Sequence, residues 1–381
     1  MKLNWLRSGL LGGMVMGCVL GSPSVAQVLQ PVDLEAIAHP DDNLWREANE
    51  GLLIESINHS LAYLDTDKAK QDYANYPIAA FSREKVRRSL LRFRTVLQQT
   101  KDPDELQRVI QKEFDFYQSV GADELGKVDF TAYFEPSYLA SPVQTAEFKY
   151  PLYRRPANFE NWATPHPSRL ELEGAAGIPP AASPLKGREL VWLPTRLQAY
   201  LVQVQGSARL QLTDGRTMTI GFHGSTDYDY VSLGKELVND GVFSLEELSL
   251  PKLMAYFETY PEKLSDYIPR NNRFIFFRET YGSPPIGSLG VPVTAGRSIA
   301  TDKSIMPPGA IALLSTQLPF PYRDGEWIKL PVNRYVLDQD TGSAIKGPGR
   351  VDIFLGTGDT AKAEAGLVND QGQLYYLLLK E

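Results

Sequence analysis

Cysteine is almost absent from this chain, which contains a single one, Cys18, among 381 residues. Cys18 lies in an amino-terminal apolar run, so the mature fold is expected to have no disulfide, cysteine-based metal site or cysteine nucleophile. Histidine is also scarce, because the sequence holds only His39, His59, His166 and His223. None of the four lies in a His-Glu-x-x-His arrangement, which argues against a zinc hydrolase.

Two further catalytic patterns and an excess of basic charge are missing as well. No Gly-x-Ser-x-Gly elbow occurs, since Ser288 lacks the required glycine spacing. The glycines around Pro348 lack the Lys-Ser/Thr pair and the following helix of a phosphate-binding loop. The formal net charge of −7 argues against a nucleic-acid partner. Carboxylates, amides, aromatic side chains and glycines remain, and these are the groups of carbohydrate chemistry.

The amino terminus has the pattern of a targeting segment, residues 1–26. Lys2 and Arg7 precede the apolar run Leu10–Leu20, which is too short to span a membrane as a mature helix. The small residues at positions 24–26 (Ser-Val-Ala) predict cleavage after residue 26 and export of the rest. A lipoprotein-type site that would acylate Cys18 is the alternative, and the sequence favours simple cleavage.

Helices are predicted after this segment, followed by strands. Two sets of apolar residues recur at helical spacing and are interpreted as core: Leu53, Ile57, Leu61 and Leu64, then Val86, Leu90, Phe93 and Leu97. A third helix is predicted to begin at Asp102, with Glu105 completing a capping box. From about Gly126 short strands alternate with Gly and Pro turns, which favours barrels over a parallel α/β sheet.

A hairpin is the clearest local prediction in this second part. The dipeptide Asp214-Gly215 separates two alternating stretches, Ala199–Leu212 and Thr217–Phe222. Asp-Gly between alternating strands is a strong short-range hairpin signal. Both stretches are therefore predicted to be strands.

The Gly-rich stretch Leu337–Gly358 is the most informative part of the chain. Its second half, Arg350–Leu355, alternates as a strand with Asp352 on the face opposite Val351. A carboxylate beside apolar neighbours is costly unless it is hydrogen-bonded or used, so Asp352 is a candidate functional group. A solvated Asp on a surface strand is the equally weighted alternative.

Ordered motifs in the sequence resemble the membrane-bound lytic murein transglycosylase A family. The similarity covers about residues 131–379, and a single motif would be weak while the ordered set is strong. Residues Ala132, Phe134 and Ala208 depart from the family pattern. The motifs are TAYFEP (131–136), YPLYRRP (150–156), VQVQGSARLQLTDGR (202–216), YVSLGKELVNDG (230–241), NNRFIFFRE (271–279), SIATDKSIMPPGAIALL (298–314), QDTGSAIKGPGRVDIFLGTGDTAKAEAG (339–366) and LYYLLL (374–379).

The resemblance implies a mainly β fold with an N-terminal helical region and a discontinuous domain arrangement. Residues 27–140, with the helices, and 271–381 would form one unit around a double-psi β-barrel. Residues 141–270 would form a second, inserted β-barrel-like domain. The carboxyl-terminal part is similar to the three-aspartate (3D) domain, and its acids correspond to Asp302, Asp340 and Asp352. Without the resemblance, Asp302 would be interpreted as a turn cap ahead of Ile305.

The resemblance further implies a peptidoglycan lytic transglycosylase that forms 1,6-anhydromuramic acid ends. Asp352 would act as the single acid/base, with Asp340 and Asp302 beside it. No metal or cofactor is expected. Several side chains are expected to hold sugars or amides: Tyr133, Glu135, Gln203, Gln205, Ser207 and Lys346. Gly206 is included in the same substrate-binding set. For each side chain, a hydrogen bond that only stabilises the fold is the alternative.

Two other classes of protein remain as alternatives at this point. One is a non-catalytic, expansin-like glycan-binding protein, which a shallow, open groove at Asp352 would favour. The other is a water-using peptidoglycan hydrolase, which needs a second acid such as Asp340 or Glu135. The expected partner is the peptidoglycan glycan strand, and other cell-wall enzymes are left open. A monomer in the periplasm is expected, either unattached or fixed to the outer membrane through a lipid anchor.

Overall fold

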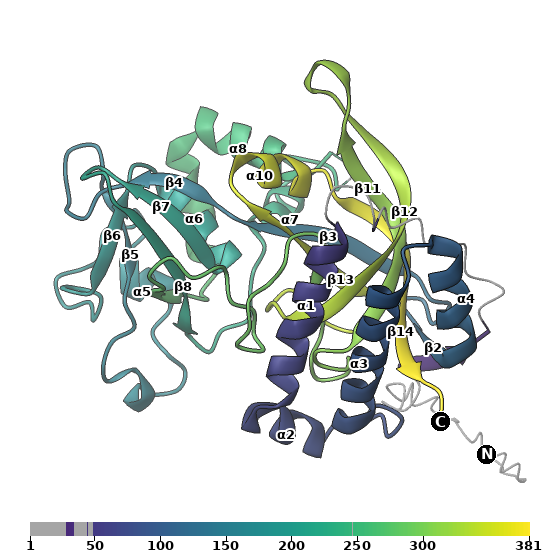
Figure 1. The fold of residues 1–381 in the computed structure, drawn as a ribbon. Helices are drawn as coiled ribbons and strands as arrows, with labels where there is room; N and C mark the ends of the chain where they lie inside the picture. The colour runs from purple at the N-terminus through teal and green to yellow at the C-terminus, as the bar shows by residue number, and fades with distance from the viewer. Residues whose placement is uncertain (1–27, 34–43, 45–48, 246) are drawn as a thin grey trace, which may run out of the picture.

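The computed structural model describes residues 28–33, 44, 49–245 and 247–381. The predicted targeting segment and Cys18 lie outside these residues. Two connected lobes make up the described chain, one built on a β-barrel and one inserted between its strands (Figure 1). Within the described ranges, no helix is both long and apolar enough to cross a membrane.

Six strands form the closed barrel, because β3 pairs with β13 on one edge and with β14 on the other. The barrel order is β14-β11-β12-β10-β13-β3, and β2 and β1 extend the sheet beyond β14. The strands of this lobe are β1 (Leu29–Val32), β2 (Phe114–Ser119), β3 (Val128–Glu135), β10 (Ser298–Ala300), β11 (Ile311–Pro321), β12 (Trp327–Asp340), β13 (Arg350–Thr357) and β14 (Asn369–Leu379).

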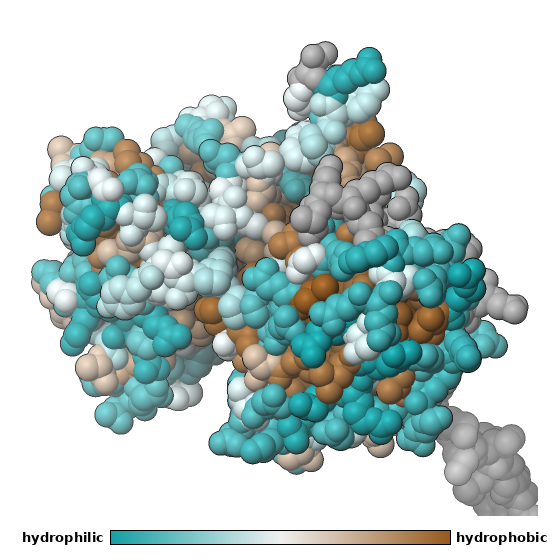
Figure 2. Space-filling view, in the orientation of Figure 1, coloured by the Kyte–Doolittle hydropathy of each residue, from teal (hydrophilic) through white to brown (hydrophobic). Residues whose placement is uncertain are grey.

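Helices pack on the outside of the barrel and complete its main core. They are α1 (Asn49–Leu64), α2 (Asp67–Ala74), α3 (Arg83–Gln99), α4 (Pro103–Glu113) and α10 (Asp359–Ala365), with the short 3₁₀ turn η6 (Arg323–Gly325) between β11 and β12. The apolar stripes predicted from helical spacing lie in α1 and α3 and are buried against the barrel strands. On the face drawn in Figure 2, hydrophobic side chains gather mainly over this helical lobe.

The start of α4 shows how local side chains set a helix boundary. Asp102 accepts a hydrogen bond from the Asp104 amide at 3.0 Å, and Pro103 occupies the first turn. Glu105 accepts from the Thr100 hydroxyl at 2.6 Å, so the predicted capping box through Glu105 is replaced by this contact. Asp102 alone therefore caps the helix.

The inserted unit (residues 137–279) has a four-stranded sheet in the order β4-β7-β8-β9 and a separate β5–β6 pair. The sequence predicted an insert of residues 141–270. Strands β4 and β9, which lie just outside this range, also belong to its sheet. Its elements are β4 (Ser137–Ala140), β5 (Tyr150–Tyr153), η3 (Phe159–Asn161), α5 (Arg169–Glu173), β6 (Glu189–Leu193), α6 (Arg196–Gln205), β7 (Ser207–Leu212), β8 (Thr217–Ser225), α7 (Leu233–Asn239), α8 (Leu250–Thr259), η4 (Pro261–Lys263), α9 (Leu264–Tyr267), η5 (Ile268–Arg270) and β9 (Ile275–Glu279).

The predicted hairpin is correct at its turn and wrong at its start. Strands β7 and β8 pair antiparallel around the Asp214-Gly215 turn, as predicted. The stretch before residue 206, however, is helix α6 rather than strand. Thr195 caps this helix by accepting from the Gln198 amide, and Gly206, with a φ of 80°, ends it. Both faces of α6 are buried against two apolar clusters, so the local alternation Val-Gln-Val-Gln carried no information on conformation.

Two glycines test how tightly the barrel is packed. A Cβ on Gly372 in β14 would lie 2.0 Å from the Ser315 carbonyl oxygen, whereas a Cβ on Gly51 in α1 would meet nothing within 4 Å. We expect Gly372→Ala to lower the free energy of unfolding by about 3 kcal/mol, since backbone must move. Gly51→Ala should raise it by up to about 1 kcal/mol through helix propensity. Urea titration of both variants measures this, and a neutral Gly372→Ala would contradict the packing.

Candidate functional site

A groove of about 1160 Å³ lies between the barrel and the inserted unit. The barrel wall consists of β3, β13 and the loop 342–350, and it carries Asp352, Tyr133 and Lys346. The inserted unit contributes the other wall through α6, the segment 229–235 and residues 271–275. A groove at a domain interface is a common place for a ligand. A second hollow of about 810 Å³ lies wholly in the inserted unit and contains none of the predicted site residues.

Asp352 lies in β13 beside Thr131 of β3 and faces the groove. Its Oδ1 atom is buried and has no hydrogen-bond partner within the described chain. The nearest cation is Arg350, whose Nη2 lies 3.8 Å from Oδ1 and also donates to the Thr131 hydroxyl at 2.8 Å. The side chain keeps 22% of its surface exposed, so the carboxyl group remains accessible from the groove.

Burial raises the pKa of the Asp352 carboxyl from 3.8 to about 6. The charge of Arg350 lowers this pKa, and the charge of Asp340 raises it, so the two neighbours oppose each other. A carboxyl group with a pKa of about 6 is protonated in about half of the molecules at pH 6 and in about a tenth at pH 7. Asp352 can therefore donate a proton and take one back.

Asp340 lies close to Asp352 but does not line the groove. Its Oδ2 accepts from the Tyr133 hydroxyl at 2.7 Å, and its Oδ1 accepts from the amides of Ser288 and Thr341, both at 2.8 Å. Burial raises the pKa of Asp340, and these hydrogen bonds oppose the rise. Asp340 thus fixes the position of Tyr133, which lines the groove beside Asp352.

Asp302 holds the loop that forms part of the barrel wall. Its Oδ2 accepts from the Gly347 amide at 2.9 Å, and its Oδ1 accepts from the amide and hydroxyl of Ser304. Burial favours the neutral form, but hydrogen bonds from Ser304 and Gly347 and the charge of Lys346 outweigh it and lower the pKa of Asp302. The Asp302 carboxylate is therefore ionised, and both of its oxygens accept hydrogen bonds. By holding the loop at Gly347, it positions the neighbouring Lys346 at the groove.

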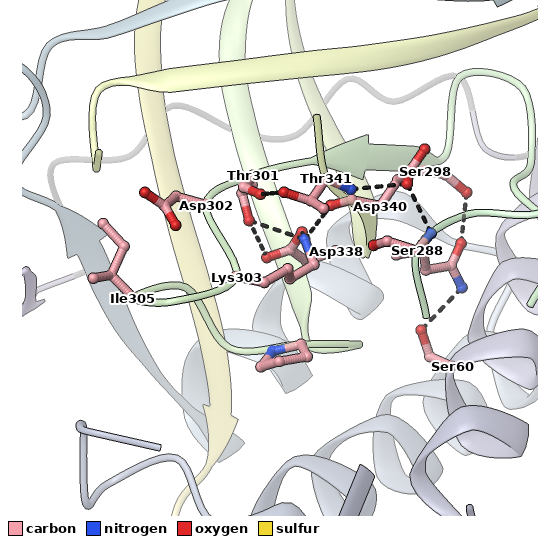
Figure 3. A network of polar contacts seen from close by, with 12 residues as sticks. Ser60, Ser288, Ser298, Thr301, Asp302, Lys303, Ile305, Asp338, Asp340 and Thr341 are labelled. Carbon is pink, nitrogen blue, oxygen red and sulfur yellow. Dashed lines mark hydrogen bonds and ion pairs between the residues drawn. The ribbon is translucent and has the colours of Figure 1, made fainter. Parts of the chain in front are cut away.

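The structure places a buried polar network behind these acids that the sequence did not predict (Figure 3). Asp338 is fully buried and accepts hydrogen bonds from Thr301 and Tyr376, each at 2.7 Å. The ammonium group of Lys303 contacts both the Asp338 carboxylate and the Asp340 carbonyl oxygen. Asp338 and Asp340 lie two residues apart in β12 and so share one face of the strand. This spacing was the only feature of the sequence that could have indicated Asp338.

The remaining predicted residues fall into two groups. Gln203 and Gln205 of α6 line the groove, and their amide oxygens accept from Arg169 Nη2 at 2.9 Å and from the Phe134 amide at 3.1 Å. Gly206, which ends α6, and Ser207, which begins β7, are not among the groove residues.

Glu135 lies away from the groove, at the end of β3. It is 1% exposed, accepts from the Thr357 hydroxyl at 2.8 Å and lies 3.7 Å from Arg209 of the inserted unit. Burial raises its pKa, against the effects of Thr357 and Arg209. This carboxyl joins the two lobes where the chain leaves the barrel. Across the described ranges, no group of three or more His, Cys, Asp or Glu side chains is arranged to hold a metal ion.

Family models match two stretches of this chain. Residues 129–278 match the MltA specific insert domain, and residues 297–378 match the 3D domain. The membrane-bound lytic murein transglycosylase A of Escherichia coli K12 is 30% identical over 266 residues, which is 69% of each chain. The Vibrio cholerae protein of the same name is 30% identical over 263 residues, 68% of each chain.

Solved structures extend the similarity over nearly the whole chain. E. coli MltA with bound chitohexaose has a TM-score of 0.71 at 25% identity, covering 93% of this chain and 96% of that one. The lytic transglycosylase LtgG of Burkholderia pseudomallei has a TM-score of 0.56 at 29% identity, covering 93% and 96%. Fold, site and relatives together define an enzyme of the lytic murein transglycosylase class. The chain belongs to the membrane-bound lytic murein transglycosylase A family.

The raised pKa of Asp352 predicts a stability gain when its charge is removed. The folded state holds the Asp352 proton more tightly than the unfolded chain, so stability falls as pH rises from about 4 to 6. At pH 7 we expect Asp352→Asn to be more stable than the wild type by about 2 kcal/mol, and the gain should vanish near pH 3.

In a matched control, Asp302→Asn, the expected change in stability has the opposite sign. The pKa of Asp302 is lowered in the fold, so Asp302→Asn should lose stability at pH 7. Urea unfolding of both variants at pH 7 and pH 3 measures these effects. An Asp352→Asn variant less stable than the wild type at pH 7 would show that the carboxylate has partners the structure lacks.

Proposed function

We propose that this enzyme cleaves the β-1,4 bond between N-acetylmuramic acid and N-acetylglucosamine in peptidoglycan, forming 1,6-anhydromuramic acid ends. The observation that carries the proposal is Asp352, a carboxyl group without a hydrogen-bond partner at Oδ1 that faces a long groove. The E. coli relative that holds chitohexaose supports a glycan strand as the occupant of this groove.

One carboxyl group suffices for this reaction because the substrate supplies its own nucleophile. Protonated Asp352 donates its proton to the glycosidic oxygen as the bond to C1 breaks. The C6 hydroxyl of the same muramic acid attacks C1, and the Asp352 carboxylate accepts the hydroxyl proton. The attacking group is tethered to the substrate, so proximity replaces the second carboxylate that glycosidases use for water.

Neither of the two acids suspected for a water-using hydrolase is suitably placed. The Asp340 carboxylate already accepts three hydrogen bonds from within the fold, and it does not line the groove. Glu135 is buried at the junction of the lobes with Thr357 and Arg209. Both carboxylates are better explained as structural groups that position strands and loops.

The finer features of the family form part of the same proposal. The closed barrel would be of the double-psi type, and the inserted domain would comprise residues 141–270 together with the flanking strands β4 and β9. The protein would be exported to the periplasm as a monomer, with attachment to the outer membrane through Cys18 as the alternative to cleavage after Ala26. Peptidoglycan strands would be its partner, and other cell-wall enzymes stay open.

Mass analysis of muropeptides tests the reaction directly. Purified peptidoglycan digested by the wild type should release 1,6-anhydro products, and Asp352→Ala should reduce this release by at least about 10³-fold, because the proposed proton donor is lost. Reducing ends in place of anhydro ends would establish hydrolysis. Binding to peptidoglycan without products from either protein would establish a non-catalytic glycan-binding protein.

The pH dependence tests the role of Asp352 as the acid. We expect kcat/KM to fall about tenfold per pH unit above about pH 6, since the proton donor ionises there. Arg350→Gln should move this limb to higher pH, because the cation lowers the pKa of Asp352. Asp340→Asn should move it to lower pH, because the Asp340 charge raises that pKa. Shifts in the same direction for both variants would exclude this assignment.

A further inference from the structure

Two cations on the inserted wall of the groove are without an acidic partner. Lys235 of α7 and Arg273, just before β9, both line the groove, and neither forms an ion pair within the described chain. Arg273 Nη1 donates to the Tyr228 carbonyl oxygen at 3.0 Å, which leaves the rest of its guanidinium available. Three arginines close to this wall, Arg169, Arg196 and Arg270, do have carboxylate partners.

The partial burial of Arg273 makes an anionic ligand favourable. Removal from water lowers the pKa of Arg273, and Asp229, which lies beyond ion-pair distance, offsets only part of this effect. A cation that is partly withdrawn from water gains free energy when an anion binds to it. Asp229 also lines the groove. The inserted wall still carries a net positive charge, because Arg169, Lys235 and Arg273 outnumber this one acid.

A further positive charge is buried in the same wall, where Arg169 lines the groove and Arg196 lies close to it. Arg169 and Arg196 share one carboxylate, Glu173, at 3.2 Å and 3.4 Å, and all three side chains are at most 10% exposed. Two guanidinium groups with one carboxylate leave a net charge of about +1 in a region of low dielectric. Arg169 also donates to the carbonyl oxygens of Asn271 and Arg273, which connects this charge to the groove surface.

The two groove cations belong to one rigid part of the wall. The Asn271 Oδ1 atom accepts from the Val231 amide at 3.2 Å and from the Arg273 amide at 3.3 Å. This side chain, itself 3% exposed, joins the segment that leads into α7 with the segment that leads into β9. A site held by such a buried hydrogen-bonding residue is preorganised for a ligand.

The proposed substrate carries the matching group. N-acetylmuramic acid bears a lactyl ether whose carboxyl group is either free or joined to a stem peptide with carboxylates of its own. Chitohexaose, which consists of N-acetylglucosamine units, carries neither. We propose that Arg273 and Lys235 form a subsite for a carboxylate of the murein strand, on the wall facing Asp352. This inference rests on the proposed function, since that function names the substrate.

Equilibrium binding to the inactive variant Asp352→Asn tests the subsite without turnover. Three ligands separate the sources of the carboxylate: peptide-free murein strands, peptide-bearing strands, and chitohexaose. In this background Arg273→Gln and Lys235→Gln should each weaken binding of a carboxylate-bearing strand about 10-fold or more, with the strand affinity falling less steeply with salt. Their binding of chitohexaose should change less than about twofold.

Two control variants complete the design. Arg273→Lys keeps the charge and should restore most of the strand affinity. Lys186→Gln removes an exposed, unpaired lysine of the inserted unit away from the groove and should change nothing. Losses on peptide-free strands assign the lactyl carboxylate, and losses on peptide-bearing strands alone assign the stem peptide.

Equal losses on chitohexaose and murein strands, or no loss on either strand, would overturn the subsite. The outcome is separate from that of the proposed reaction. Should the wild type release no anhydro product while the charge-dependent binding pattern holds, the subsite stands and the cleavage chemistry fails. If the wild type releases anhydro products but the binding pattern is absent, the cleavage chemistry stands and the subsite fails.

Discussion

The pairing of β3 on both of its edges is the constraint on which the site depends. Parallel pairing with β13 sets Asp352 beside Thr131 and Phe354 beside Tyr133, and antiparallel pairing with β14 closes the barrel. Closure leaves no free edge among the six strands, so Asp352 has a strand neighbour on each side, Thr131 in β3 and Ala300 in β10. The same strand then ends at Glu135, where the chain enters the inserted unit. The strand that closes the barrel therefore also leads the chain into the unit that forms the other wall of the groove.

The acids of the barrel lobe divide by how well they are hydrogen-bonded. Asp302, Asp338 and Asp340 each accept two or more hydrogen bonds, and they hold a loop, the Lys303 ammonium group and the Tyr133 hydroxyl in place. Asp352 differs, because its buried Oδ1 has no partner. An unsatisfied buried carboxylate costs stability, whereas the acids of the network in Figure 3 are hydrogen-bonded. The unfavourable environment is also what makes this group a suitable acid.

The two walls of the groove carry different chemistry. The barrel wall presents one carboxyl group whose pKa is raised by burial, and the inserted wall presents cations supported by a buried excess of positive charge. A polymer that is neutral along its sugar chain and anionic at its substituents is complementary to such a pair of walls. Binding energy from the substituent would then position the scissile bond against Asp352.

Several features of this protein were determined by the sequence itself. Alternation around Asp352 predicted β13, Asp214-Gly215 predicted a hairpin turn, and the ordered motifs predicted the family. Each depends on contacts close in the chain or on a recognisable pattern. Helix α6 was missed because its conformation is decided by two apolar clusters distant in sequence. Only the tertiary structure placed Glu135 outside the groove, added Asp338 and Lys303 behind it, and set Arg273 on its wall, because burial and pairing arise from segments up to a hundred or more residues apart.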